Sequence, residues 1–417
     1  MSFQHGLSGL SAASTNLDVI GNNIANVNTV GFKQSQAQFT DIFANSLSGA
    51  GSSQVGIGAR VSTVAQSFSQ GGISPTSNPL DIAINGQGFY RMDEGGVISY
   101  SRNGQFHVDG NGFLTNANGA NLTGYMADTN GNIDASKPTN LKLTTSDLAP
   151  QATSIFELGF NLNSGDDPAA VTTFSVNDLD SRNWETSGSI FDSLGNEHSL
   201  VTYFQKSAAN TWNVYATVDG TVDAAGVPQG VTLSSQALTF DGTGALILPT
   251  APITVDVDWT AINPTLGAVS PLSFSLDLTK GTQHGADRSS PNFISQDGFG
   301  AGRLAGFVTS ADGLIQGSYT NSQTRTLGQI VLANFINPQG LNPVGDGRWI
   351  ETPSSGQPVV GPPETGTLGS LQASAVEDAN VDLTTELVKM ITAQRMYQAN
   401  AKTIETQDAI MQTLVNL

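Results

Sequence analysis

Helical spacing of apolar side chains marks both ends of the chain. Near the N-terminus one stripe follows alternating steps of four and three residues, through Phe3, Leu7, Leu10, Ser14, Leu17, Gly21 and Ile24. Near the C-terminus the same steps run through Leu383, Leu387, Met390, Gln394, Tyr397, Ala401, Ile404, Asp408, Met411 and Val415. Asp382 is a suitable N-cap and Glu386 lies in the first turn, so the pattern predicts a helix over roughly 383–416.

Two interpretations of these stripes remain open. The helices either close a hairpin within one chain or pack against copies of the chain. Polar or missing side chains at Ser14, Gly21 and Gln394 weaken a contact between two helices alone. Further apolar positions widen the adhesive surface beyond one stripe, namely Leu371, Val376, Val388, Ile391, Ile410, Leu414 and Leu417.

The N-terminal segment is poor in charge and rich in asparagine. Residues 1–32 hold a single charged side chain, Asp18, and the face near the helix end carries Asn22, Asn23, Asn26 and Asn28. Like charges stacked by symmetry would repel, whereas amides hydrogen-bond across subunits without adding charge. Such a face therefore favours packing between copies. Gly31 is expected to end the helix as a left-handed cap.

Between the two ends the apolar period changes to two. Turn dipeptides at Asn103-Gly104, Asp109-Gly110, Asn111-Gly112 and Asn118-Gly119 separate short alternating runs, which predicts hairpins. No helical pattern interrupts residues 80–370, so this region is expected to be β throughout. The Gly/Ser-rich stretch 44–59 predicts a linker or loose arm.

Composition excludes several classes of function. The 417 residues exceed what one core of ~250 to 300 residues usually serves, so several domains are expected. A net charge of -19 would repel a phosphate backbone, so no nucleic acid partner is expected. The absence of cysteine excludes disulfides and thiolate metal sites. The sequence shows neither a cleavable leader nor a run of about 18 apolar residues, so no membrane insertion is expected.

Residues that carry catalysis or bind metals show no spacing typical of a site. The four histidines are scattered along the chain, at His5, His107, His198 and His284. The glycines of residues 300–305 lack the strand and helix that surround a dinucleotide-binding loop. We therefore expect no enzyme activity, no metal and no cofactor.

Several long motifs resemble one protein family. The segment NLDVIGNNIANVNTVGFKQSQ, residues 16–36, resembles the N-terminal signature of the flagellar rod and hook protein family, and residues 380–417 resemble its C-terminal helix. NPLDIAINGQGFYRM, residues 78–92, is similar to the shared β domain. Residues 188–204 and 297–341 resemble the hook members rather than the rod members, which lack a large central insertion. Residues 205–285 match little that is diagnostic.

The resemblance implies a mainly β, multidomain fold with discontinuous nested domains and terminal α-helices packed as a coiled-coil-like pair. The implied parts are a helical inner-tube domain (1–32 and 370–417), a linker or arm (33–70), a β middle domain (71–150 and 290–369) and an inserted outer β domain (151–289).

The implied function is structural. A hook subunit self-assembles into a curved, flexible tube that joins rod to filament and transmits motor torque as a universal joint. The implied location is the extracellular flagellum, reached through the flagellar type III export apparatus without a cleaved signal peptide. The implied partners are copies of the chain itself, the distal rod protein, the hook cap protein, the hook-filament junction protein and the export apparatus.

The residues expected to form contacts between subunits lie at the two helical ends. They are Phe3, Leu7, Leu10, Leu17, Ile20, Asn22, Asn23, Ile24, Asn26, Gly31, Phe32, Leu383, Leu387, Met390, Ile391, Tyr397, Ala401, Ile404, Met411 and Leu414.

Two alternatives remain open. A distal rod protein would share the terminal motifs, although the central insertion argues against it. An oligomeric surface adhesin or enzyme that binds glycans would use its helices only to oligomerise. Its sugar site would be lined by Trp184, Trp212 and Trp259, taken as exposed, because exposed aromatic faces suit stacking against sugars.

Overall fold

The computed structural model describes residues 2–42, 56, 58–128, 131–143, 146–233 and 235–415, without the side chains of residues 2, 414 and 415. The predicted linker at 44–59 lies outside the described residues apart from residue 56 and the start of one strand. The chain divides into two compact units. Unit 1 comprises residues 1–145, 305–318 and 324–417, and unit 2 comprises residues 146–304 and 319–323.

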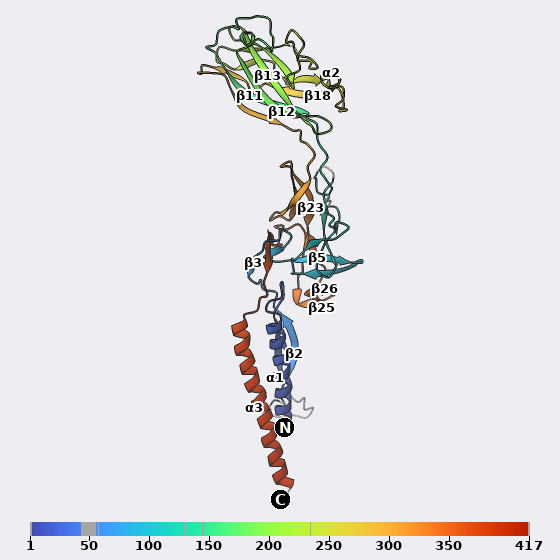
Figure 1. Cartoon of the computed structure of the whole chain (residues 1–417). Coiled ribbons are helices and arrows are strands. Elements are labelled where there is room, and N and C mark those ends of the chain that lie inside the picture. Colours follow the sequence, from blue (N-terminus) through green and yellow to red (C-terminus); the bar gives the residue numbers. More distant parts are fainter. Residues whose placement is uncertain are drawn as a thin grey trace. The chain divides into compact units, whose positions relative to one another are not determined.

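Unit 1 contains both long helices and a large β region (Figure 1). The helices are α1 (Ser2–Ala25) and α3 (Leu383–Val415). Its first ten strands are β1 (Ser35–Ile42), β2 (Gly58–Gln66), β3 (Ile73–Pro75), β4 (Ile82–Asn85), β5 (Phe89–Glu94), β6 (Val97–Ser101), β7 (His107–Val108), β8 (Leu114–Thr115), β9 (Asn121–Met126) and β10 (Thr139–Asn140). The later ones are β21 (Leu304–Thr309), β22 (Leu314–Tyr319), β23 (Thr324–Ile330), β24 (Leu332–Asn334), β25 (Asn342–Gly345), β26 (Arg348–Ile350), β27 (Val359–Gly361), β28 (Ser370–Ala373) and β29 (Ala375–Glu377), with a 3₁₀ turn η2 at Pro338–Gly340.

Distant parts of the sequence pair within unit 1. The central path of its main sheet runs β21-β22-β23-β9-β5-β6-β26-β25, which joins strands from before and after the insertion. C-terminal β28 and β29 pair with β4 and β3. The β1–β2 hairpin contacts α1. Buried apolar side chains such as Ile84, Tyr90, Leu122 and Leu332 form the main core under the sheet.

Unit 2 has two five-stranded sheets around one core. Its elements are β11 (Ile155–Asn163), η1 (Leu179–Ser181), β12 (Trp184–Phe191), β13 (Glu197–Ala208), β14 (Thr211–Val218), β15 (Gln236–Phe240), β16 (Leu246–Leu248), β17 (Ile253–Val257), α2 (Trp259–Ile262), β18 (Leu272–Asp277), β19 (Thr282–His284) and β20 (Ser290–Gln296). One sheet has the order β12 to β16, and the other is built on β11. Alternate residues of β14, such as Trp212 and Val214, point into the shared core, as period two predicts.

The mainly β middle predicted from the sequence is confirmed, with one correction. The short helix α2 interrupts it, because the carboxylate of Asp258 accepts a hydrogen bond from the Thr260 N–H and starts a single turn. The C-terminal helix begins as predicted at the Asp382 cap, whose carboxylate accepts a 2.6 Å bond from the Thr385 N–H. This bond from the Thr385 backbone is the largest cause that lowers the pKa of Asp382.

One type of turn recurs in both units. An Asp or Asn side chain accepts hydrogen bonds from the backbone N–H groups two and four residues later, and a glycine three residues later has positive φ. The first residues of these turns are Asp109, Asn116, Asp192, Asp223 and Asp241. The hairpin signals at Asn111-Gly112 and Asn118-Gly119 belong to this type.

The hairpin expected at Asn103-Gly104 is wrong. Gly104 accepts a bond from the Ile82 N–H, and a Cβ on Gly104 would lie 1.7 Å from the Ile82 carbonyl oxygen. The glycine is therefore required by close backbone approach between two chain segments and not by a reverse turn.

Gly104→Ala is expected to lower the free energy of unfolding by about 3 kcal/mol, because backbone must move to admit the methyl group. Gly110→Ala is the matched control, since no atom lies within 4 Å of its added Cβ. Urea unfolding of the full chain, followed by tryptophan fluorescence, compares the two. Equal effects of the substitutions would contradict this account of Gly104.

Candidate functional site

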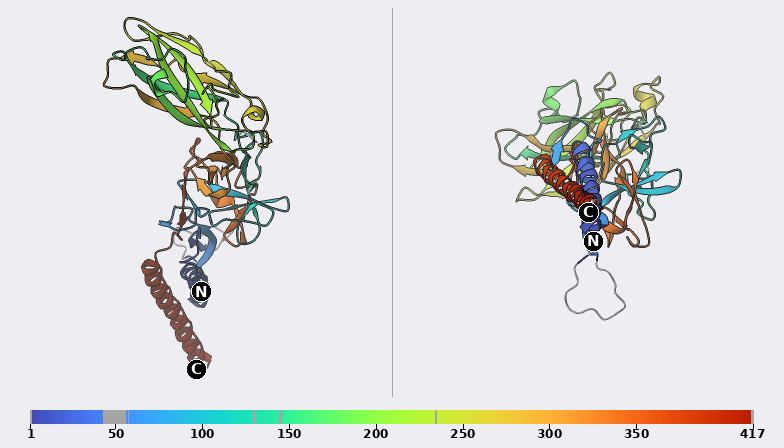
Figure 2. Two further views of the ribbon diagram at one scale, coloured as in Figure 1. Left: turned by 45° about the horizontal axis from the view of Figure 1, so that its top comes forward. Right: turned by 90° about the horizontal axis from the view of Figure 1, so that it is seen from below.

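The two terminal helices pack side by side and antiparallel (Figures 1 and 2). A Cβ added to Gly6 would lie 2.9 Å from Ile404, and one added to Gly9 would lie 2.7 Å from Asn400. At the other end of α1, the Asn23 amide donates to Glu386 at 3.2 Å. These contacts fix the register of the pair and confirm the predicted pairing of the chain ends.

The face that α1 turns to α3 consists mainly of small residues. Gly6 and Gly9 contact α3 directly, and Ala13, Ile20 and Asn23 are buried further along the same stripe. The successive steps between these residues are three, four, seven and three, which is heptad spacing displaced by one residue from the predicted stripe. Small side chains allow the two backbones to approach closely, whereas a stripe of Phe and Leu would hold them apart.

The seam predicted from the large apolar residues of α1 is therefore wrong. Phe3 and Leu7 are 51% and 54% exposed, and nothing lies within 4 Å of a Cβ added to Gly21. On α3, Glu386 and Ala393 are 1% exposed, whereas Leu387 and Ile391 are 44% and 52% exposed. Pairing within the chain thus leaves large apolar side chains of both helices uncovered.

The residues expected to contact other subunits fall into three groups. The exposed group is Phe3, Leu7, Asn22, Leu383, Leu387, Ile391, Tyr397 and Met411. The half-buried group is Leu10, Leu17, Ile24, Asn26, Phe32, Met390, Ala401 and Ile404. The buried group is Ile20, Asn23 and Gly31. The Leu414 side chain lies outside the described residues.

Asn23 has a role inside the chain that the sequence did not reveal. Its side-chain amide donates to the Ser35 carbonyl at 2.8 Å and accepts from the Ser35 N–H at 2.9 Å. Glu386, which receives the second Asn23 N–H, also accepts from Gln34 at 2.7 Å and pairs with Lys389 at 2.6 Å. This network ties the start of α3 to the end of α1 and the start of β1.

A buried cluster of three charges lies where the helices meet the β part of unit 1. Lys33 and Arg102 bond the two carboxylate oxygens of Glu377 at 2.7 and 2.8 Å. All three side chains are almost fully buried. Burial disfavours the charge on Glu377, but attraction by Arg102 and Lys33 holds the pKa of Glu377 below its ordinary value. For Lys33, burial lowers the pKa despite Glu377.

The predicted helix cap at Gly31 is corrected by this junction. Helix α1 already ends at Ala25, and Gly31 lies beyond two further turns with a φ of +70°. A Cβ on Gly31 would come within 2.6 Å of the Asn103 nitrogen. The positive φ was predicted correctly, but it serves close packing against the Arg102–Asn103 backbone.

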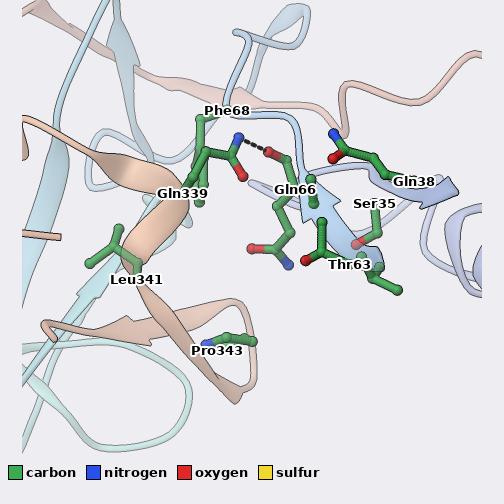
Figure 3. A pocket seen from close by; sticks show the side chains of 10 residues that line it. Ser35, Gln38, Thr63, Gln66, Phe68, Gln339, Leu341 and Pro343 are labelled. Atoms are coloured by element: carbon green, nitrogen blue, oxygen red, sulfur yellow. Dashed lines mark hydrogen bonds between the residues drawn. The ribbon is translucent and has the colours of Figure 1, made fainter. Parts of the chain in front are cut away.

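Figure 3 shows a pocket in unit 1 with a volume of about 550 Å³ between the β1–β2 hairpin and the segment around η2. The Gln339 amide donates to the Gln66 carbonyl at 2.5 Å across it. The lining combines Ser, Thr and Gln with apolar side chains and includes no ionisable one. The pocket therefore offers no general acid or base.

The aromatic side chains proposed for a glycan site do not form one. Trp212 and Trp259 are 0% and 1% exposed and belong to the core of unit 2, and Trp184 packs against that core. Their assignment as exposed was wrong, because the alternation of β14 turns Trp212 inward. His198 lies between Asp219, at 2.7 Å, and Asp192, at 3.4 Å, a contact that its sequence position did not indicate.

The described part of the chain offers neither a cluster of metal ligands nor a membrane-spanning helix. Across residues 2–415, apart from the undescribed gaps, His, Asp and Glu side chains form no group of three suited to hold a metal ion. No helix in the same part of the chain is long and apolar enough to cross a membrane.

Comparison with known families covers most of the chain in four segments. Residues 3–33 match the flagella basal body rod protein family, and residues 83–154 match the flagellar hook protein FlgE/F/G D1 domain. Residues 161–299 match the flagellar basal body protein FlaE D2 domain, and residues 372–417 match the flagellar basal body rod FlgEFG protein C-terminal family.

Full-length relatives decide the identity. The chain is 42% identical to flagellar hook protein FlgE of Escherichia coli, with 100% of both chains covered. The chain belongs to the flagellar hook protein family. Flagellar hook protein FlgE of Salmonella typhimurium is 42% identical, with 100% of both chains covered. Flagellar hook protein FlgE of Borreliella burgdorferi is 33% identical, with 100% of this chain and 99% of that one covered.

A solved hook protein shares the fold. The crystal structure of Helicobacter pylori flagellar hook protein FlgE2 matches with a TM-score of 0.54 at 14% identity, covering 73% of this chain and 100% of that one. The hook protein family is a structural family of the extracellular flagellum, and the predicted family membership is confirmed.

Gly9→Leu is expected to push α1 away from α3 and to lower the unfolding free energy of the helix pair by about 1–3 kcal/mol. Gly21→Leu is the control, because its side chain enters open space and improves helix propensity by up to ~1 kcal/mol. Thermal unfolding followed by circular dichroism at 222 nm measures both. A Gly9→Leu chain as stable as the control would contradict the small-residue seam.

The buried cluster should make stability depend on acid pH. Because the pKa of Glu377 is lower in the folded chain, its contribution is fully present above about pH 4.5 and is lost as pH falls through the lower folded value. The stability difference between the native chain and Glu377→Gln should therefore be about 3 kcal/mol near pH 7. It should shrink below pH 4. Urea titrations at several pH values test this, and a pH-independent difference would refute it.

Proposed function

We propose that this chain is the subunit of a bacterial flagellar hook and polymerises into a curved, flexible tube that transmits motor torque between rod and filament. The observation that carries the proposal is the uncovered apolar surface of both terminal helices, in a chain that belongs to the hook protein family. Burying that surface against neighbouring copies supplies a driving force of about 25 cal/mol per Å².

The division of labour follows from the character of each part. Closely packed helices resist twist, so residues 1–32 and 370–417 are proposed to form the inner tube. Residues 33–70 would serve as the arm, residues 71–150 and 290–369 as the middle β domain, and residues 151–289 as the outer β domain. Polar β surfaces break and remake contacts at small energetic cost, which suits a tube that stays bent while it rotates.

The specific partners are part of the proposal. Besides its own copies, the subunit would contact the distal rod protein, the hook cap protein and the hook-filament junction protein, and would pass through the flagellar type III export apparatus. We infer no catalytic role, because the pocket described above lacks ionisable groups, two of the candidate glycan-binding tryptophans are buried, and Trp184 packs against the core of unit 2.

The double substitution Leu387→Asp and Ile391→Asp is expected to abolish tube formation while the isolated chain keeps its β core. Both side chains are exposed on α3, so the change costs little within one subunit but buries charge between subunits. Electron microscopy under polymerising conditions and swarming of cells that carry the variant provide the readouts.

The control is Val97→Asp, which places one Asp charge on an apolar side-chain site that is 64% exposed and lies beside the turn of a β-hairpin. We expect control tubes to form. Normal tubes from the double variant would refute the assignment of the helix faces to contacts between subunits.

A further inference from the structure

Three stretches of chain join the helix pair to the β part of unit 1. They are the segment between α1 and β1, the segment between β2 and β3, and the segment between β29 and α3. Non-helical connections of this kind bend easily when nothing holds them together. The stiffness of the junction therefore depends on the bonds that link these three stretches to one another.

Glu377 bonds all of them. Its backbone carbonyl accepts from the Gly31 N–H at 2.7 Å. One carboxylate oxygen accepts from Lys33 Nζ at 2.7 Å and from the Gly71 N–H at 3.0 Å, and the other accepts from Arg102 at 2.8 Å. Glu377 is the last residue of β29. The third stretch, which leads to α3 and includes Asn380, therefore begins directly after it.

The two cations make further bonds to different stretches of the chain. Lys33 donates a second bond to the Ser69 carbonyl at 2.7 Å, which holds the stretch after β2. Arg102 donates to the carbonyls of Gly86 and Gly88 at 3.0 and 2.6 Å, on the connection between β4 and β5. Each of these three bonds has a charged donor, and the bond to the Gly88 carbonyl is also buried. Bonds with a charged donor are shorter and stronger than neutral bonds.

Asn380 adds a neutral link on the helix side of the cluster. Its side-chain oxygen accepts from the Gln34 N–H at 2.7 Å, and its amide donates to the Ser67 and Ser69 carbonyls at 2.8 and 3.1 Å. Beyond it lies the Asn23–Glu386 bond between the helices. A continuous series of polar contacts thus runs from the helix pair to the β4–β5 connection.

From this arrangement we propose that the Lys33–Glu377–Arg102 cluster is the torsional joint of the subunit, through which twist of the helix pair reaches the β part of unit 1. The inference rests on the proposed function, since only a torque-bearing tube loads this junction. Shear across the junction has to break several buried, charge-assisted bonds together. Removing the carboxylate leaves two buried cations without an anion and opens the junction to water.

The test uses hooks built from the full chain, with torque applied through a bead on the hook and the twist angle recorded. Glu377→Gln is expected to form tubes of normal appearance, because the exposed helix faces are unchanged. Twist per unit torque should rise by about twofold or more, as local opening replaces an ordered cluster. Lys33→Met should give a smaller rise, because the Arg102–Glu377 pair remains.

Two controls separate a joint from general stabilisation. Glu94→Gln removes a salt bridge to Arg348 in which the Glu94 side chain is 53% exposed. This variant should leave the twist unchanged, because exposed salt bridges contribute little. Leu122→Ala leaves a cavity in the β core and lowers the unfolding temperature without touching the cluster, and it should also leave the twist unchanged.

The outcomes are distinguishable. Equal twist in Glu377→Gln and native hooks overturns the proposal, as does an equal rise in Leu122→Ala hooks. If Glu377→Gln chains form no tubes, the Lys33→Met hooks decide the question. A higher twist per unit torque than in native hooks supports the joint, and an equal twist per unit torque overturns it. Failure of the native chain to form tubes at all would instead refute the proposed function.

Discussion

The close approach of α1 and α3 through small residues is the constraint on which the rest of the structure depends. Gly6, Gly9 and Ala13 occupy the face where the backbones meet, so the large apolar side chains of α1 have to lie elsewhere on its surface. The chain thereby satisfies its own pairing with little apolar area and leaves Phe3, Leu7 and large apolar side chains of α3 exposed. Intramolecular pairing and self-assembly, which the sequence posed as alternatives, are therefore compatible, because pairing leaves other faces of the same helices exposed.

Much of this arrangement can be read from local sequence signals. Heptad steps and the Asp382 cap located α3 almost to the residue, and period two identified the β region. The orientation of α1 could not be predicted in this way, because periodicity shows that a stripe exists but not which of two adjacent stripes meets the partner. Large apolar residues suggested the wrong stripe, since the pairing depends on the absence of side chains at Gly6 and Gly9.

The buried polar residues were the hardest to foresee. Lys33, Arg102 and Glu377 are far apart in the sequence, and nothing in their neighbours distinguishes them from surface charges. The low charge of residues 1–32 was a partial signal, because a lysine directly after such a segment is conspicuous. Asn23 stood out because it lies in an asparagine-rich segment. Its partners Ser35 and Glu386, however, depend on a tertiary fold that one sequence does not reveal.

The recurrent turns closed by an Asp or Asn side chain have a consequence for the order in which the chain folds. Each turn completes its bonds within five residues, so the hairpins pay little loop-closure entropy and do not depend on distant segments. Joining α1 to α3, in contrast, closes a loop of nearly the whole chain, for example between Gly6 and Ile404. Short-range contacts in these hairpins and long-range contacts at the chain ends favour early hairpins and late pairing of the termini. A folding chain would thus hold formed hairpins before its two terminal helices meet.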